Sequence, residues 1–372
     1  MMDAEDFERH GLYDPGAPNA AGRLALLRFN VEHGITLQEL VEAQRSGRLP
    51  YVVADPIIRG EGARLTIAEA AERSGLTVEQ IARMWRAAGF AEPGPEDRPF
   101  SESDLEVLPV LAMAESMFGT EVTLQLVRVI GSSMARIAET EIMAFAFQVS
   151  GKTTAEGWSE LDVATLHVDV LGPLLSYVAK AFDMLHRRHL DAVSRRLAPD
   201  PFDQEVDRRT LAVGFADLCG FTALSGTMTP ADLSGAVAAF EAHTSDLVSG
   251  EGGRVVKLIG DEVMFAAPDP ATGCTIAVRL VEAFAGHPVL PPLRAGVAVG
   301  EALHFEGDYF GSVVNLAARL VAVAEPRQVV VPTTLADSLG SAWHATDLGA
   351  HHLKGFSEPV ALAAIELRNS PA

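Results

Sequence analysis

The strongest constraint in the sequence is one change of pattern, at Pro199 and Pro201. Before these prolines the periodicity is largely helical, and the last stretch, 173–197, is typical of one long amphipathic helix. After them, short β-branched segments that predict strands alternate with helical segments. Because proline ends a helix, we expect two domains: an all-helical domain at 1–197 and an α+β domain at 207–367.

Composition narrows the classes of partner. The chain has 372 residues, of which 48% are hydrophobic and 21% charged, as in a globular protein large enough for two cores. Its formal net charge is -21, so we do not expect a general binder of nucleic acid or of an anionic membrane. If the chain handles a polyphosphate, the positive charge must be local or come from metal ions.

Cysteine usage and the N-terminus predict a cytoplasmic protein. The two cysteines, Cys219 and Cys274, are too few for a disulfide framework or a cysteine-based zinc site. The N-terminus is acidic and has no apolar core of a signal peptide. No uninterrupted apolar stretch approaches the roughly 18 residues of a membrane helix, so we expect no membrane contact.

Residues 65–90 predict a helix, a turn and a second helix. Thr66 and Thr77 suit helix N-caps, and Gly75 suits the turn between the helices. The segment resembles the first half of winged-helix DNA-binding domains. Its basic residues alternate with acidic ones that cancel most of their charge, so we expect an internal regulatory or dimerising role and not DNA binding. The basic residues are Arg64, Arg73, Arg83 and Arg86, and the acidic ones are Glu69, Glu72 and Glu79.

Two carboxylates in the second domain fall at predicted strand ends. Asp217 ends a strand before a glycine-containing turn, and Asp261 lies in the Gly260-Asp261 dipeptide, which is typical of a tight hairpin. Two carboxylates on neighbouring strand ends suit a pair of hard cations such as Mg²⁺. Each residue taken alone is equally typical of a turn or cap.

Three further polar residues occupy positions that favour ligand binding. Lys257 lies inside a strand otherwise built of Val, Leu and Ile, where an unpaired ammonium is costly, so an anion or acceptor should meet it. Asn315 and Arg319 are four residues apart on a predicted helix and therefore project from one face. An amide beside a guanidinium suits a sugar and a phosphate, although such a pair is also common on surfaces.

These segments together resemble one enzyme family. FADLCGFT at 215–222, KLIGDEVMF at 257–265 and GDYFGSVVNLAAR at 307–319, in this order, are similar to the motifs of the class III adenylyl and guanylyl cyclases. The resemblance covers nearly all of 207–367. It implies a ferredoxin-like α+β domain that works as a dimer, with active sites across the interface.

The resemblance also implies roles for individual residues. Asp217 and Asp261 would bind two divalent metal ions, Mg²⁺ or Mn²⁺. Lys257 and Asp308 would read the purine. Asn315 would orient the ribose, Arg319 would stabilise the transition state, and Lys354 would contact the triphosphate. The transfer to Lys354 rests only on the short segment LKGF.

Donor and acceptor chemistry favours ATP over GTP. Adenine offers an acceptor at N1 and a donor at its 6-amino group, whereas guanine offers the reverse pattern. A lysine only donates and a carboxylate only accepts, so Lys257 with Asp308 matches adenine. We therefore expect an adenylyl cyclase that converts ATP to cyclic AMP and pyrophosphate.

All six key positions occur in one chain, which predicts a homodimer with two equivalent sites. Two rival interpretations use the same residues: a diguanylate cyclase, because Gly260-Asp261-Glu262 resembles its signature, and a catalytically dead cyclase-like regulator. The later Asn315/Arg319 helix fits class III better, and no metal Asp or Arg is lost. A P-loop at Gly151-Lys152-Thr153 is rejected because the glycine required five positions earlier is Ala146.

The layout of a helical domain joined by a long helix to this cyclase resembles the autoinhibited, acid-sensing adenylyl cyclases of mycobacteria. We therefore expect helix 173–197 to transmit the state of a regulatory domain, with a proton or small molecule as effector. His167, His186 and His189 are candidate titrating groups, although solvated or packed histidines are the simpler interpretation. Six apolar residues are candidates for a lipid pocket, with core packing expected instead: Met113, Met117, Met134, Met143, Phe145 and Phe147.

Overall fold

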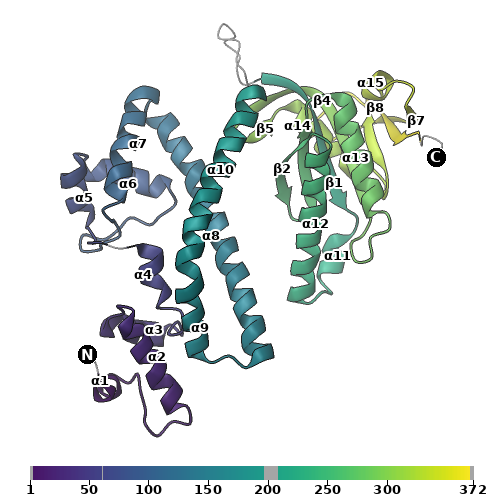
Figure 1. Cartoon of the computed structure of the whole chain (residues 1–372). Helices are drawn as coiled ribbons and strands as arrows, with labels where there is room; N and C mark the ends of the chain where they lie inside the picture. Colours follow the sequence, from purple (N-terminus) through teal and green to yellow (C-terminus); the bar gives the residue numbers. More distant parts are fainter. Residues whose placement is uncertain (1–2, 61, 197–207, 369–372) are drawn as a thin grey trace. The chain divides into compact units, whose positions relative to one another are not determined.

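The chain divides into two compact units. A computed structural model describes residues 3–60, 62–196 and 208–368 (Figure 1). The units are Met1–Ala198 and Pro199–Ala372. The first is helical and the second combines helices with one sheet, so the predicted fold class is confirmed. The predicted junction, 198–207, lies outside the described residues.

The described part of the N-terminal unit consists of α-helices and one π-helical turn. Two cores hold it together: one joins α1, α2 and α3 to Ala164 of α9, and the other joins α5, α6 and α7. The helices are α1 (Ala4–Arg9), α2 (Ala20–Glu32), α3 (Leu37–Arg45), α4 (Ala54–Arg59), α5 (Ile67–Ser74), α6 (Val78–Ala87), α7 (Asp104–Phe118), α8 (Thr120–Glu156), α9 (Glu160–Leu166) and α10 (Gly172–Arg196), with the π-helix His167–Leu171 between the last two. Gly151-Lys152-Thr153 lies inside α8, which confirms the rejection of a P-loop.

The predicted helix-turn-helix is present. Thr66 and Thr77 both form capping boxes, and Gly75 ends α5 in the left-handed conformation. An antiparallel bridge between Leu65 and Phe100 joins the segment before α5 to the segment before α7. Its arginines are occupied by partners inside the unit: Arg73 with Glu102, Arg83 with Glu115, Arg86 with Glu79 and Glu92, Arg98 with Glu69, and Arg64 with the carbonyls of Arg59 and Pro99. These pairs leave little free positive charge for a phosphate backbone.

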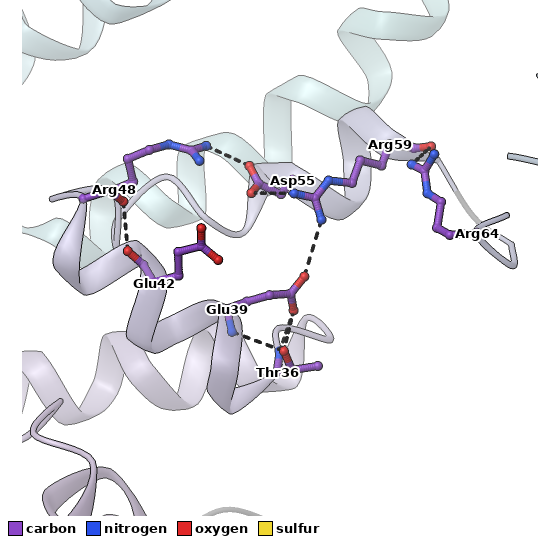
Figure 2. Close-up of polar contacts among 8 residues, drawn as sticks. Thr36, Glu39, Glu42, Arg48, Asp55, Arg59 and Arg64 are labelled. Carbon is purple, nitrogen blue, oxygen red and sulfur yellow. Dashed lines mark hydrogen bonds and ion pairs between the residues drawn. The ribbon is translucent and has the colours of Figure 1, made fainter. Parts of the chain in front are cut away.

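An ion-pair network fixes α4 beside α3 (Figure 2). Asp55 accepts from Arg48 at 2.9 Å and from Arg59 at 3.3 Å, and Arg59 also reaches Glu39 at 3.4 Å. Glu39 in turn caps α3 through the backbone N–H of Thr36. Because α4 also packs against the π-helix His167–Leu171, the network supports that helix as well.

The expectation of core packing is wrong for the methionines of α7 and α8. Met113, Met117, Met134 and Met143 are 44–70% exposed. Phe145 is partly buried against the His167 ring, at 4.6 Å between ring centroids, and the Phe147 side chain lies outside the described residues. Helical periodicity alone does not tell a core face from an exposed apolar face, which is why the sequence misled here.

The expectation that no segment is long and apolar enough for a membrane also needs correction. The helical run Glu160–Arg195, through α9 and α10, meets that test by length and composition, with 17% of its most apolar window buried. Polar residues interrupt the run, so it does not appear as one uninterrupted apolar stretch in the sequence. A core helix of a soluble protein meets the same test, so the finding is weak evidence for a membrane.

A close helix contact in the N-terminal unit leads to a stability prediction. A Cβ atom added at Gly131 of α8 would lie 2.3 Å from the carbonyl oxygen of Ala88, at the end of α6. Since that neighbour is backbone, we expect Gly131→Ala to lower the free energy of unfolding of this unit by about 1–3 kcal/mol. Urea unfolding of the full chain measures this. The control is Gly172→Ala, whose nearest contact is 3.9 Å away; an equal midpoint for both variants would contradict the prediction.

The C-terminal unit has eight strands in one sheet and five α-helices among its described residues. The strands are β1 (Arg208–Leu218), β2 (Arg254–Ile259), β3 (Glu262–Ala267), β4 (Leu293–Phe305), β5 (Asp308–Phe310), β6 (Val329–Pro332), β7 (Trp343–His351) and β8 (Val360–Leu367). The helices are α11 (Phe221–Ser225), α12 (Pro230–Gly250), α13 (Pro270–Phe284), α14 (Ser312–Val323) and α15 (Thr333–Ser338). The hairpin predicted at Gly260-Asp261 joins β2 to β3.

The sheet has a hydrophobic core on each face. Its order is β2-β3-β1-β4-β6-β8-β7, with β5 paired to β4; only β4 and β6 run parallel. Residues of α12 and α13 pack on one face, together with Ala216, Val263 and Phe265. Residues of α14 pack on the other face, together with Phe215 and Met264. Side chains alternate along a strand, so this division assigns a face to every strand residue.

Candidate active site

Three acidic side chains and one guanidinium meet where β1 ends beside the β2–β3 hairpin. Asp217 lies opposite Glu262 in the β1–β3 register, and the backbone N–H of Leu218 donates to the Asp261 carbonyl at 3.1 Å. Arg294 of β4 donates to one oxygen of Asp217 from Nε at 2.9 Å and from Nη2 at 2.7 Å. The two predicted metal ligands, Asp217 and Asp261, are therefore neighbours.

Charge at this place is unbalanced. The pKa of Glu262 is raised to about 7, mainly by burial and also by the nearby Asp217 and Asp261 carboxylates, while Arg294 opposes the rise. Among the described residues no three His, Cys, Asp or Glu side chains form a complete metal cage. Asp217 and Asp261, next to Glu262, nevertheless fit hard divalent cations. Mg²⁺ takes few protein oxygens and completes its coordination shell with phosphate and water. The donor set thus fits the predicted ions.

The raised pKa of Glu262 predicts a pH-dependent stability. Between its ordinary pKa and about 7 the folded chain binds more protons than the unfolded chain, so the free energy of unfolding falls as pH rises through this window and levels off above it. We expect Glu262→Gln to flatten the fall in Tm between pH 5 and pH 8 with a chelator present. Thermal melts of both proteins measure it, with the exposed Glu282→Gln of α13 as control. Parallel curves for the wild type and Glu262→Gln would contradict the prediction.

The lysine inside β2 has the anionic partner that the sequence required. Lys257 Nζ lies 2.5 Å from Asp308 Oδ2, and the two side chains are 40% and 25% exposed. The other oxygen of Asp308 accepts the backbone N–H of Tyr309 at 2.8 Å. The two residues predicted to read the purine, 51 positions apart in the chain, therefore form one pair that solvent and a ligand can reach.

Asp217, Glu262 and this pair share one face of the sheet. Lys257 lies opposite Met264, and Met264 belongs to the core under α14. Asp217 and Glu262 are each two residues from a member of the same core, so they point to that face as well. A nucleotide lying on this face would meet both groups.

The other three predicted site residues are exposed. Asn315 and Arg319 lie on α14, on the same helix face as expected, and Lys354 lies in the turn between β7 and β8. Within the described residues, no hydrogen bond or ion pair joins any of the three to Asp217 or to Lys257. One chain therefore brings together two parts of the predicted site but not the third.

The sequence did not identify Arg294 and Glu262 as members of the site. Arg294 carries a signal that was available, because it is the one charged residue in the strand-like stretch LRAGVAVG, as Lys257 is in its strand. Glu262 carries no such signal. A glutamate after a hairpin is ordinarily solvated, and only the register of β1 against β3 places it beside Asp217.

Comparison with known proteins identifies the family of this chain. Residues 6–190 match the family model of the adenylate cyclase regulatory domain. An adenylate cyclase of Streptomyces coelicolor is 37% identical over 285 residues, which cover 76% of this chain and 74% of that protein. The chain belongs to the adenylate cyclase family. The activity class predicted for this cyclase is thereby confirmed, and its helical unit matches a regulatory domain.

Two further similarities cover different shares of this cyclase. A pH-sensitive adenylate cyclase of Mycobacterium tuberculosis is 29% identical over 368 residues, which cover 94% of this chain and 89% of that protein. The solved structure of the adenylyl cyclase CyaB from P. aeruginosa covers 44% of this chain and 96% of its own, with 23% identity and a TM-score of 0.38.

Proposed function

We propose that this cyclase converts ATP to 3′,5′-cyclic AMP and pyrophosphate with two divalent metal ions, at two equivalent sites of a homodimer. Residues 207–367 would be the catalytic domain and 1–197 the regulatory domain. The observation that carries the proposal is the Lys257–Asp308 pair on the same sheet face as Asp217, which lies beside the hairpin that contains Asp261. It supports a purine-reading pair and a cation site within reach of one nucleotide.

The residues divide the work according to their chemistry. Lys257 donates to N1 of adenine and Asp308 accepts from its 6-amino group. Asp217 and Asp261 would hold the metal ions, and Arg294 keeps the Asp217 carboxylate in place with two hydrogen bonds. Bound Mg²⁺ or Mn²⁺ would make the ribose 3′-hydroxyl more acidic and neutralise charge on the leaving pyrophosphate. No side chain is assigned as a general base.

The remaining polar residues act on the sugar and the phosphates. Asn315 orients the ribose, and Arg319 adds positive charge where the α-phosphorus becomes more negative during in-line attack. Lys354 contacts the triphosphate. Arg319 and Lys354 are exposed and unpaired among the described residues, so they are free to bind an anion.

A second copy of the chain would complete each site. Asn315 and Arg319 make no contact with the carboxylates of their own chain in the described residues. Large apolar side chains also surround the purine pair: Ile259, Leu303, Phe305 and Phe310 are 42–50% exposed. An exposed apolar cluster beside an active site favours burial against a partner. These observations support a symmetric dimer in which α14 of one subunit faces the carboxylates of the other.

The rival activities have less support. A diguanylate cyclase needs to read guanine, whose donor pattern does not match Lys257 with Asp308. A catalytically dead regulator is disfavoured because neither metal carboxylate is lost. DNA binding is disfavoured because the arginines of the helix-turn-helix are engaged by glutamates and carbonyls.

The proposed regulation acts from the N-terminal domain, with a proton as one candidate effector. The similarity to a pH-sensitive cyclase supports it. His186 and His189 are exposed on α10, whereas His167 is buried and donates from Nδ1 to the Val163 carbonyl at 2.7 Å. Replacing His186 and His189 with Asn and finding an unchanged pH profile of activity would discard their role.

The direct test is cyclic nucleotide production by the purified full-length protein. ATP and GTP are supplied separately, each with Mg²⁺ and with Mn²⁺, between pH 5.5 and pH 8. Cyclic AMP from the wild type and none from Asp217→Ala would support the proposal. Silence of the full chain with activity of residues 200–372 would indicate autoinhibition, and silence of both would exclude the enzyme activity.

A further inference from the structure

Strand β2 contains a bulge that places two basic residues on one face. Arg254 lies opposite Ala266 and Lys257 lies opposite Met264, with Val256 as the extra residue between them. Residues three apart on a regular strand point to opposite faces, but one inserted residue restores them to the same face. Arg254 and Lys257 therefore both face the side of the sheet that carries the proposed site.

Arg254 holds the segment around Asp308 from two sides. Its Nη2 donates to the carbonyl of Gly307 at 3.0 Å, and its guanidinium carbon lies 5.2 Å from the centre of the Tyr309 ring. Gly307 precedes Asp308 and Tyr309 follows it. The Tyr309 side chain is buried, at 9% exposure, so this stacking contact is shielded from solvent.

Asp308 depends on such support because its own strand is short. β5 has three residues and pairs only with the end of β4. The connection is the two-residue turn Glu306-Gly307, in which both residues have positive φ, at 53° and 81°. Glutamate is uncommon in this conformation, so contacts from outside the hairpin help to hold the turn.

One donor of Arg254 has no partner. Its Nε atom is buried and makes no hydrogen bond among the described residues. A buried unpaired N–H in a folded protein is unusual and calls for a reason. The contacts with Gly307 and Tyr309 hold the guanidinium in this position although its Nε atom gains no partner there.

We propose that Arg254 is a positioning residue that sets the purine preference of the enzyme. Lys257 contacts Asp308 directly, and Arg254 fixes the turn that delivers Asp308, so β2 determines both halves of the adenine-reading pair. Without Arg254 the carboxylate would no longer be held at the distance that suits the 6-amino group. This inference rests on the proposed function of Lys257 and Asp308.

The test compares ATP with GTP in the full-length variants Arg254→Met and Arg254→Lys. For Arg254→Met we expect KM for ATP to rise about tenfold with a smaller change in kcat, and the ratio of kcat/KM for ATP over GTP to fall about tenfold. Arg254→Lys keeps the positive charge over the Tyr309 ring but loses the planar guanidinium. Its ratio of kcat/KM for ATP over GTP should therefore lie between that of the wild type and that of Arg254→Met. Arg279→Met, which breaks the exposed pair with Glu251 on the same unit, is the matched control and should keep the wild-type ratio.

Each outcome separates the positioning role from a structural one. Equal losses for ATP and GTP, or an unchanged ratio, would overturn the inference while leaving the cyclase activity intact. If Arg254→Met only has a lower Tm, and Arg254→Lys keeps the wild-type ratio of kcat/KM for ATP over GTP, the role of Arg254 is structural. That outcome would also overturn the inference. A wild type that makes no cyclic AMP, or that shows no preference for ATP, would overturn the proposed function and this inference together.

Discussion

Two inactive variants of this cyclase are expected to restore activity when they are mixed. Asp217→Ala removes a metal carboxylate and Arg319→Ala removes charge at the α-phosphorus, so each alone should lower kcat by at least about 10³-fold. If each site takes its carboxylates from one subunit and its α14 residues from the other, a mixed dimer has one intact site. Random exchange makes half of the dimers mixed, so about a quarter of the wild-type activity should return.

The measurement is cyclic AMP formation at equimolar amounts of the two variants, after incubation long enough for subunits to exchange. Mixing Asp217→Ala with Asp261→Ala is the matched control, because both changes fall in the same half of the site and no mixed dimer is complete. Recovery in the first mixture only would support shared sites. No recovery despite proven exchange would mean that one chain contains the whole site.

Exchanging the two residues of the purine pair is expected to reverse the nucleotide preference. Lys257→Glu with Asp308→Lys keeps an ion pair at the same place, but its acceptor and donor now match N1 and O6 of guanine. A mispaired polar group in a recognition site costs up to about 10⁴–10⁵ in kcat/KM when buried. Because these side chains are 40% and 25% exposed, we expect a smaller loss for ATP, of about 10³-fold, with a gain for GTP.

Steady-state kinetics with both nucleotides check this reversal. The control is the same exchange at an ion pair away from the site, Glu251→Arg with Arg279→Glu, which should leave the preference unchanged. The single variant Lys257→Glu places two carboxylates together and should lose ATP activity without gaining GTP activity. An ATP preference that survives the double exchange would show that other residues read the base.

Local sequence signals were sufficient for much of the fold and for the prediction that Lys257 has a partner. Caps at Thr66 and Thr77 and the Gly260-Asp261 hairpin depend on neighbours within a few residues, so the sequence predicts them directly. Lys257 was informative because a charge inside an apolar strand requires a partner. That requirement is physical and does not depend on knowing where the partner comes from.

The sequence by itself determined the two units, the family and the need for a partner of Lys257. Only the tertiary structure decided that Asp308 is that partner, that Arg294 holds Asp217, and that a bulge turns Arg254 to the same face. The exposure of the methionines on α7 and α8 was likewise decided by packing. The reason is common to all four: strand register and the choice of packed face depend on contacts between distant segments, which no local pattern encodes.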